Sequence, residues 1–342
     1  MKITYPLSYR AIELAAYQTN ILRAILGLKI TQKTLVNLPP DKLLLRMEAA
    51  PCNPSDIAFL QGSYNVVKAL PTVPGFEGCG IVVDVGEEVD GDYWLGRRVS
   101  CFLSGNSDGT WAEYFVTDET QIISAHPDFE SHQAAVFFVN PFTAYALMDE
   151  AVRHKSQSVI INAAGSRLAE YLLALAQFNN IKTIGIVRKE KTAEVLRNKG
   201  FDEVLDSTDE NYESQLKEVI HRLKPTTFFD AVAGEASGTI VNLMPKNSQL
   251  IVYGGLSTKP LSGINAMQLI FNGLHIKGFD LNKWFVSTEK SEIQMATILL
   301  SALVLEKNVE NPISIEVGIE EVAKGIRHYL GSMSEGKMLI RF

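Results

Sequence analysis

Residues 158–177 contain, in order, a short apolar run, a turn of small residues and a predicted helix. A segment of this kind could bind a nucleotide pyrophosphate. The run is β-branched, as in a central parallel strand, and apolar residues then recur at helical spacing. The turn has Ala164, Ser166 and Ala169 where dinucleotide-binding turns have the glycines of G-x-G-x-x-G. Small side chains there still let backbone N–H groups at the helix start approach a phosphate. The stretch predicts a dinucleotide turn, with an ordinary strand-turn-helix connection as the alternative.

The end of the next predicted strand, residues 183–187, indicates which dinucleotide would bind. NAD-preferring domains place Asp or Glu there, about 20 residues beyond the glycine turn, to hold the ribose 2′-OH. This strand ends in Val187 and is followed by Arg188 and Lys189, which could pair with a 2′-phosphate. NADPH is therefore predicted over NADH. The alternative for these two residues is a solvated, basic start to the next helix.

Further candidates for cofactor contacts lie in the first turn and at later strand ends. Arg167 occupies the phosphate turn, where it could reach phosphate or point to solvent. Two glycine-containing loops follow the predicted strands 228–231 and 249–253, at the edge where doubly wound sheets bind ligands; ordinary turn chemistry would also place glycine there. The predicted contacts from these segments are Gly165, Ser166, Arg167, Leu168, Gly234, Gly254, Gly255 and Leu256.

These residues need elements to position them, and the chain changes character near residue 126. Residues 1–125 contain short strands and turns, such as strands 43–49 and 79–85. Residues 126–285 alternate between helix and strand, the rhythm of a doubly wound parallel sheet. Residues 286–342 offer a helix, a strand, a helix and a last strand, too few to fold alone, so we expect them to return to the first domain. The predicted fold is α/β, with a β-rich domain and a Rossmann domain.

Composition excludes several classes of protein. The 342 residues carry a formal net charge of −7 without local charge blocks, which argues against nucleic-acid or membrane-surface binding. Three cysteines lack C-x-x-C spacing, so neither a disulfide framework nor a cysteine zinc lobe is indicated. The N-terminus lacks an apolar signal core, and the longest apolar runs fall short of the ~20 residues that span a bilayer. We expect a cytoplasmic protein.

The motifs, taken together in chain order, resemble the medium-chain dehydrogenase/reductase superfamily over nearly the whole length. That resemblance implies a GroES-like domain, an inserted Rossmann domain and a C-terminal return. The matching segments besides the turn of residues 158–177 are residues 53–56 (NPSD), 73–78 (VPGFEG) with a glycine at position 80, 109–114 (GTWAEY) and 140–145 (NPFTAY).

Zinc-dependent members of the superfamily hold a catalytic metal with a Cys in C-x-[ST]-D and a His in G-H-E. In this sequence those positions are Asn53 and Phe76, and neither side chain is a normal zinc ligand. Cys52 is displaced by one residue. The four-cysteine structural lobe is also missing, because residues 100–108 contain only Cys101. We therefore predict no metal.

The sequence is most similar to two zinc-free branches, the NADPH:quinone oxidoreductases and the 2-enoyl thioester reductases. In the latter, a tyrosine at the position of Tyr64 is the proposed proton donor, and the resemblance carries that role to Tyr64. The reaction needs such a group, because hydride addition to the β-carbon of an enoyl thioester leaves an enolate that must be stabilised and protonated. The alternative is a turn tyrosine that packs its ring on the domain surface.

The resemblance implies four further contacts to the cofactor. Asn53 would lie beside the nicotinamide ribose and is the second predicted catalytic residue, although it could simply cap the helix that starts at Pro54. Thr143 would lie near the carboxamide, or its hydroxyl could bond its own helix backbone. Phe279 lies in a loop that closes on the same side, and Lys337 would approach from the C-terminal return.

The leading hypothesis is a zinc-independent, NADPH-dependent oxidoreductase that reduces an activated C=C bond, in a 2-enoyl thioester or related enone, or a quinone. Hydride transfer is expected in the interdomain cleft. One alternative is a quinone reductase without a dedicated proton donor. Another is a non-catalytic NADPH-binding sensor or structural protein, suggested by the degenerate turn. Relatives often dimerise through Rossmann sheet edges, so a homodimer is expected, with residues 249–253 and 274–279 as the candidate edge.

Overall fold

The computed structural model describes residues 3–306, 308–333 and 335–342, and the chain divides into two compact units. Unit 1 runs up to Val139 and resumes at Glu310, while unit 2 is Asn140–Val309. Both boundaries lie later in the chain than the predicted positions, 125/126 and 285/286. The first is later because α4 (Ser131–Ala135) packs on three strands of unit 1, β3, β4 and β5. The second is later because the helices that follow residue 280 pack within unit 2.

Unit 1 is β-rich, as the sequence predicts. Its nine strands among the described residues are β1 (Leu7–Leu14), β2 (Leu28–Leu35), β3 (Leu43–Cys52), β4 (Glu77–Val85), β5 (Arg98–Phe102), β6 (Tyr114–Thr117), β7 (Ile122–Ser124), β14 (Ile313–Gly318) and β15 (Lys337–Arg341). Its helices are α1 (Ile21–Leu26), α2 (Pro54–Leu60), α3 (Gly91–Trp94), α4 and α13 (Val322–Ser332), with short 3-10 turns at Glu119–Gln121 and Ile319–Glu321.

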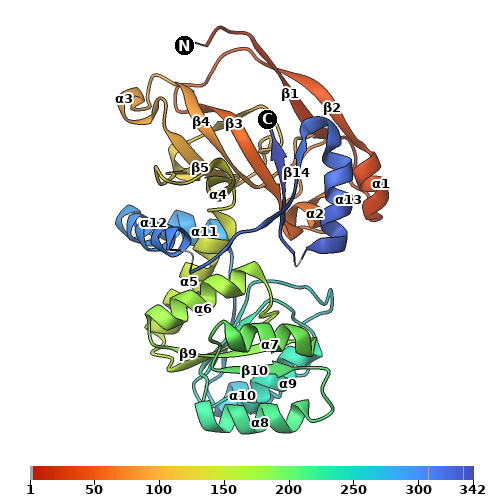
Figure 1. The fold of residues 1–342 in the computed structure, drawn as a ribbon, viewed down its shortest axis with the longest axis vertical. Helices are drawn as coiled ribbons and strands as arrows, with labels where there is room; N and C mark the ends of the chain where they lie inside the picture. Colours follow the sequence, from red (N-terminus) through yellow and green to blue (C-terminus); the bar gives the residue numbers. More distant parts are fainter. Residues whose placement is uncertain (1–2, 307, 334) are drawn as a thin grey trace. The chain divides into compact units, whose positions relative to one another are not determined.

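The C-terminal return completes the main sheet of unit 1. Its strand order is β14-β15-β3-β4-β5-β7, with β6 also paired to β3, and β1 and β2 form a separate hairpin. β15 pairs antiparallel with β3, so that Met338 lies opposite Cys52. Helix α13 lies against β14 and β15 and contacts α1 from the start of the chain (Figure 1). The last 33 residues are therefore part of the same core as the first domain.

Unit 2 is the predicted doubly wound domain. Its six strands are β8 (Ser158–Asn162), β9 (Lys182–Val187), β10 (Glu203–Asp206), β11 (Thr227–Asp230), β12 (Gln249–Val252) and β13 (His275–Gly278). Its helices are α5 (Val139–Arg153), α6 (Arg167–Phe178), α7 (Glu190–Asn198), α8 (Tyr212–Leu223), α9 (Glu235–Leu243), α10 (Ala266–Phe271), α11 (Leu281–Ser287) and α12 (Lys290–Leu305).

All six strands of unit 2 are parallel, in the order β10-β9-β8-β11-β12-β13. This order places β8 at the centre, where the chain switches from one half of the sheet to the other, and all carboxyl ends at one edge. Apolar residues of α8 and α9 pack with those of the strands in one continuous core. The sheet therefore brings the loops after β8, β9, β11, β12 and β13 to a common edge.

The prediction that the first helix of residues 286–342 returns to the first domain was wrong. This helix, α12, belongs to unit 2. Arg153 of α5 donates to Glu292 at 3.3 Å, and the ring of Phe142 packs against Trp284 and Phe285 of the preceding α11. Across the described ranges, no helix is both long enough and apolar enough to cross a membrane.

Candidate functional site

The predicted cofactor residues of unit 2 gather at the carboxyl edge of its sheet. Each segment begins directly after a strand, and parallel strands end at the same edge. The segments are residues 165–168 after β8, Arg188 and Lys189 after β9, Gly234 after β11, residues 254–256 after β12, and Phe279 after β13. The sequence thus placed five separated segments on one edge, and the fold of unit 2 agrees.

The turn after β8 compensates in part for its missing glycines. Ala163 adopts the left-handed conformation, with φ of 46°, that glycine would take without strain. Ser166 is the N-cap of α6, and its hydroxyl accepts the N–H of Ala169 at 3.3 Å. Gly165 is exposed, and a Cβ there would lie 3.0 Å from Thr192 Cγ2. The turn presents a capped helix N-terminus whose dipole favours a bound anion.

Arg167 is tied to its own helix. Its Nη1 donates to Glu170 Oε1 at 2.9 Å, and Lys199 donates to the same oxygen at 2.5 Å. Neither option weighed from the sequence, a free reach to phosphate or a solvent-facing side chain, describes this arrangement. Arg167 lies in the first turn of α6 with its charge already paired.

Arg188 and Lys189 are exposed at the end of β9, and within the described ranges neither side chain forms an ion pair or a hydrogen bond. On the neighbouring strand, Asp206 lies opposite Val187. Its carboxylate accepts the backbone N–H and the hydroxyl of Thr208, at 2.9 and 2.8 Å, so it is engaged locally. The two basic side chains are thus available to a phosphate group.

The loops after β11 and β12 are held together by backbone contacts. Leu256 N–H donates to Ala231 O at 3.0 Å, and a Cβ on Gly254 would lie 2.7 Å from that same oxygen. Close approach therefore requires glycine at position 254, for a reason of packing that the sequence alone did not reveal.

A buried polar pair beneath these loops was not predicted from the sequence. Asn162 at the end of β8 donates to Asp230 Oδ1 at 2.5 Å, and this oxygen also accepts the N–H groups of Val232 and Ala233. In the described part of the chain, Asp230 Oδ2 and the Tyr253 hydroxyl are buried without a hydrogen-bond partner. Burial raises the pKa of Tyr253 well above its usual range. Polar residues at adjoining strand ends were the only sequence signal for this pair.

These features fit a bound dinucleotide. The capped start of α6 suits the pyrophosphate, the unpaired Arg188 suits a 2′-phosphate, and the glycine-lined loops leave room for close backbone approach. Unpartnered buried oxygens at the same edge are sites that an ordered water or a ligand would satisfy.

In unit 1, Asn53 connects β3 to α2 as the N-cap residue, with Pro54 at the first helical position. Its amide does more than cap the helix. Nδ2 donates to Glu77 Oε1 at 2.9 Å, and Oδ1 accepts a hydrogen bond from Lys337 Nζ. Lys337 Nζ also lies 3.8 Å from Glu77 Oε1. The three side chains, which come from distant parts of the sequence, form one buried cluster at most 7 % exposed.

Asp56 joins this cluster from α2. Its carboxylate accepts the N–H of Asn53 at 2.7 Å and that of Phe76 at 3.1 Å, and the residue is fully buried. Burial raises the pKa of Asp56 to about 7, against the effect of the two N–H groups and Lys337. Sequence analysis gave Asp56 and Glu77 no role, although both stand inside the matching segments.

Tyr64 and Phe76 are neighbours in unit 1. Tyr64 lies in the loop after α2, half-buried, and its ring centroid is 5.1 Å from that of Phe76. Phe76 in turn packs edge-on against Phe59 at 5.5 Å. The Tyr64 ring therefore packs on an aromatic cluster that includes Phe76, the residue at the position of the zinc-ligating His in zinc-dependent members of the superfamily. The role of Tyr64 as proton donor stays a prediction.

The donor groups of unit 1 do not suit a metal ion. In the described ranges no three His, Cys, Asp or Glu side chains lie together as a possible ligand set. Cys52 is buried, and burial raises the pKa of its thiol, which disfavours the thiolate that zinc needs. The ammonium of Lys337 already donates to Asn53 and pairs with Glu77, and its charge would repel a metal cation.

Comparison with known proteins gives the family. Residues 39–127 match the model of the alcohol dehydrogenase GroES-like domain, and residues 168–298 match that of the zinc-binding dehydrogenases. The mitochondrial enoyl-[acyl-carrier-protein] reductase of Arabidopsis thaliana is 30% identical over 320 residues, covering 90% of this chain and 84% of the relative. The chain belongs to the medium-chain dehydrogenase/reductase superfamily. Within that superfamily it falls in the zinc-free branch, so the words "zinc-binding" in the second description are inherited and unsupported by Asn53 and Phe76.

Two solved structures show the same superfamily fold over the whole chain. A putative NADPH:quinone reductase from Mesorhizobium loti superposes with a TM-score of 0.90 at 27% identity, covering 99% of this chain and all of that one. The mitochondrial 2-enoyl thioester reductase Etr1p/Etr2p heterodimer from Candida tropicalis gives 0.81 at 20% identity, covering 98% and 100%. The second, at this identity, supports the fold alone.

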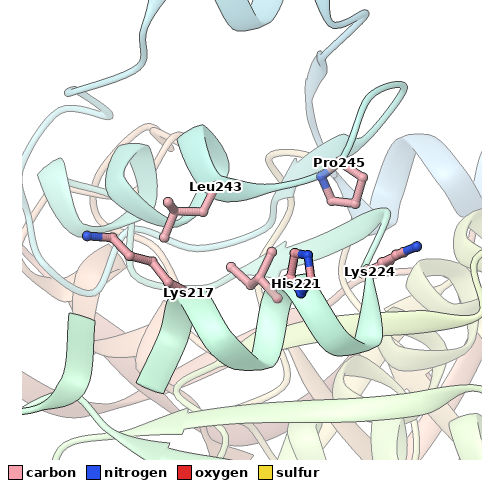
Figure 2. A pocket seen from close by; sticks show the side chains of 6 residues that line it. Lys217, His221, Lys224, Leu243 and Pro245 are labelled. Atoms are coloured by element: carbon pink, nitrogen blue, oxygen red, sulfur yellow. The ribbon is translucent and has the colours of Figure 1, made fainter. Parts of the chain in front are cut away.

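Two other features of unit 2 bear on the predicted site. Thr143 is buried in α5, and within the described ranges its hydroxyl makes no hydrogen bond to the helix backbone. A surface hollow of about 280 Å³ beside α8 is lined by Lys217, His221 and Lys224 with Leu243 and Pro245. The amino groups of its two lysines point away from each other (Figure 2). Its α8 residues precede β11 in the chain, and Leu243 and Pro245 precede β12, so the lining comes from segments that lead into strands. It contains none of the predicted site residues.

Proposed function

We propose that this chain is an NADPH-dependent reductase of activated C=C bonds, with 2-enoyl thioesters as the preferred class of acceptor. Bound NADPH supplies a hydride from C4 of its nicotinamide, and the acceptor takes it at the electron-poor β-carbon. The proposal rests most directly on Tyr64, a phenol held against Phe76 in a zinc-free site, in a chain 30% identical to an enoyl reductase.

The residues of unit 2 would hold the cofactor. The start of α6, with Gly165, Ser166 and Leu168, would bind the pyrophosphate through backbone N–H groups. Arg188 and Lys189 would bind the 2′-phosphate, which is the basis for NADPH over NADH. The nicotinamide half would be held by the loops at the other strand ends and by Thr143; these contacts are Gly234, Gly254, Gly255, Leu256 and Phe279.

In unit 1, Tyr64 would donate the proton and Asn53 would orient the nicotinamide ribose. The buried amide of Asn53 is fixed in one orientation, because Lys337 binds its oxygen and Glu77 its nitrogen. Lys337 would act on the cofactor from the same cluster. Fixed donors of this kind contribute by being in place before charge develops on the substrate.

Replacement of Tyr64 by Phe tests the mechanism. We expect crotonyl-thioester reduction to slow by about 10²-fold or more, as for loss of a general acid, with NADPH affinity unchanged. Quinone reduction by the same variant, which depends less on a placed proton donor, should change little. Tyr93→Phe, at an exposed tyrosine on α3, is the matched control. Full thioester activity in Tyr64→Phe would remove the tyrosine from the mechanism.

A quinone is the second candidate acceptor. It is favoured by the TM-score of 0.90 to a putative NADPH:quinone reductase. Comparison of kcat/KM for quinones and for enoyl thioesters in the wild-type protein decides between the two. Tight NADPH binding with no turnover of either class would instead support the non-catalytic alternative.

A homodimer is also proposed, and the exposed edge of unit 2 supports it. β13 is the last strand of the sheet, and the adjoining α10 has no buried residue. Exposed apolar side chains on these two elements are Met267, Leu269, Ile270, Phe271 and Ile276. Light scattering should give twice the chain mass of 37.8 kDa. The cytoplasm is the proposed compartment, although the similar enoyl reductases of Arabidopsis thaliana and Homo sapiens are named as mitochondrial proteins.

A further inference from the structure

Lys68 is a buried cation beside the proposed proton donor that neither the sequence motifs nor the relatives' names point to. It lies in the loop between α2 and β4 and is 3 % exposed. Its Nζ is 5.2 Å from the ring centre of Phe59 and 5.7 Å from that of Phe76. Among the described residues its one hydrogen-bond acceptor is Ser107 O, at 2.8 Å. Two of its three N–H groups are therefore without an oxygen acceptor, and the aromatic faces stabilise the charge.

Several polar groups surround this ammonium. Asp56 faces it from α2 and Asp108 from the loop before β6, and both favour the charged form. Lys33 of β2 pairs with Asp108 at 3.1 Å. The Tyr17 hydroxyl binds the backbone of Lys68, accepting its N–H at 2.8 Å. Burial dominates and lowers the pKa of Lys68 to about 8, so the side chain is still mainly charged at neutral pH.

Phe76 is shared by Lys68 and Tyr64. The ring of Tyr64 packs on it at 5.1 Å, and the ammonium lies over it at 5.7 Å. Charges that share a buried aromatic neighbour are weakly screened by solvent, so their interaction is stronger than at an exposed surface. A cation there favours the state in which negative charge appears on Tyr64.

We propose that Lys68 is a positioning residue of the reduction, whose ammonium promotes proton donation by Tyr64 because it stabilises the phenolate that forms. The inference rests on the proposed function. In the step concerned, the acceptor has taken hydride at its β-carbon and carries the electron pair as an enolate. The O–H bond of Tyr64 breaks, its proton forms the new C–H bond at the α-carbon, and its electron pair stays on the phenolate oxygen. Water later returns the proton to Tyr64.

The pH dependence follows from the sign of the charge. Below pH 8 Lys68 is protonated and assists the step, and above that pH it becomes neutral and the assistance is lost. The kcat for thioester reduction should therefore fall as the pH rises through about 8. The same variation in pH should leave the affinity for NADPH unchanged, because Lys68 is not one of the predicted cofactor contacts.

Lys68→Met removes the charge and keeps an unbranched side chain that packs well on aromatic rings. We expect kcat for crotonyl thioester at pH 7 to fall about 10-fold, with the alkaline decline near pH 8 abolished. Lys68→Arg should restore most of the activity. Lys33→Met is the matched control. Lys33 pairs with Asp108, in the loop before β6 that also contains Ser107, the hydrogen-bond acceptor of Lys68. Its loss should leave kcat within about twofold of wild type.

A double-mutant cycle with Tyr64→Phe separates this role from a structural one. If Lys68 acts through Tyr64, Lys68→Met should cost less than about twofold in the Tyr64→Phe background. An equal loss in both backgrounds, or an alkaline decline that persists in Lys68→Met, would overturn the inference while leaving the reductase intact. Wild-type protein with no turnover of any acceptor would contradict the proposed function, and this inference with it.

Discussion

In unit 1 the charged groups of the site are buried against one another, whereas in unit 2 the predicted cofactor residues lie at open strand ends. Lys337, Asn53 and Glu77 satisfy each other in the core of the first unit. At the edge of the second, Arg188 is exposed, and among residues 3–306, 308–333 and 335–342 neither an ion-pair partner for Arg188 nor a hydrogen-bond partner for Asp230 Oδ2 is found.

The polar site residues therefore contribute differently to folding stability in the two units. A buried network is rigid and orients its members before substrate arrives, but it is costly to interrupt. Open strand ends contribute little to folding and leave their donors free for a ligand. Substitutions in unit 1 should therefore change stability first, and those at the edge of unit 2 should change binding first.

Lys337→Met is the strongest test of the buried side. It leaves Glu77 buried without its cation, and breaking a buried pair in this way typically destabilises by about 3–5 kcal/mol. Urea unfolding should show a loss in that range. Lys324→Met, which breaks an exposed pair with Glu321 in the same unit, should cost less than about 1 kcal/mol. Equal, small losses for both lysines would mean that the buried cluster carries no special weight.

Arg188→Ala tests the open side. Loss of a charge-assisted hydrogen bond to the 2′-phosphate should weaken NADPH binding by about 10- to 100-fold and leave NADH binding and the unfolding free energy unchanged. Titration of nicotinamide fluorescence with each cofactor measures the effect. Arg222→Ala is the control: this arginine lies on α8, pairs with Glu203 of β10, and its loss should change neither affinity. Unaltered NADPH affinity in Arg188→Ala would show that the basic pair is only a solvated helix start.

Much of the fold was predictable because its elements have strong local patterns. β8 and β9 are rich in β-branched apolar residues, and α6 has regular apolar spacing. The predicted strand 183–187 therefore agrees with β9 within one residue, and the predicted stretch 158–177 agrees with β8 and α6 within one residue at each end. Helix α9 was missed because its residues are small and weakly helical. Close tertiary packing stabilises α9 in place of helix propensity. At Gly238, for example, a Cβ would lie 2.1 Å from Ser262 O, so only glycine fits there.

The site residues also differ in how far the sequence predicts their positions. Residues that follow strands in unit 2 could be placed on one edge from the strand order alone. The cluster of unit 1 could not, because Lys337 meets Asn53 only through the pairing of β15 with β3, almost 300 positions apart in the chain. Lys68 was missed for a related reason: a lone lysine in a loop looks like surface, and its burial against Phe59 and Phe76 is a property of the folded unit.

The smallest predicted effect concerns the glycine-poor turn of unit 2. Ala163 holds φ at 46°, which costs a residue with a Cβ on the order of 1 kcal/mol and glycine almost nothing. After the entropy that glycine adds to the unfolded chain, Ala163→Gly should raise the unfolding free energy by about 0.5 kcal/mol or leave it unchanged. Ala169→Gly, in the helical first turn of α6, should instead lower it by about 1 kcal/mol. If Ala163→Gly weakens NADPH binding, the strained alanine helps to hold the turn ready for the phosphate, and this part of unit 2 is preorganised like unit 1. If NADPH binding is unchanged, the turn is not preorganised, as expected for the exposed strand ends of unit 2. Its missing glycines then lower only the unfolding free energy.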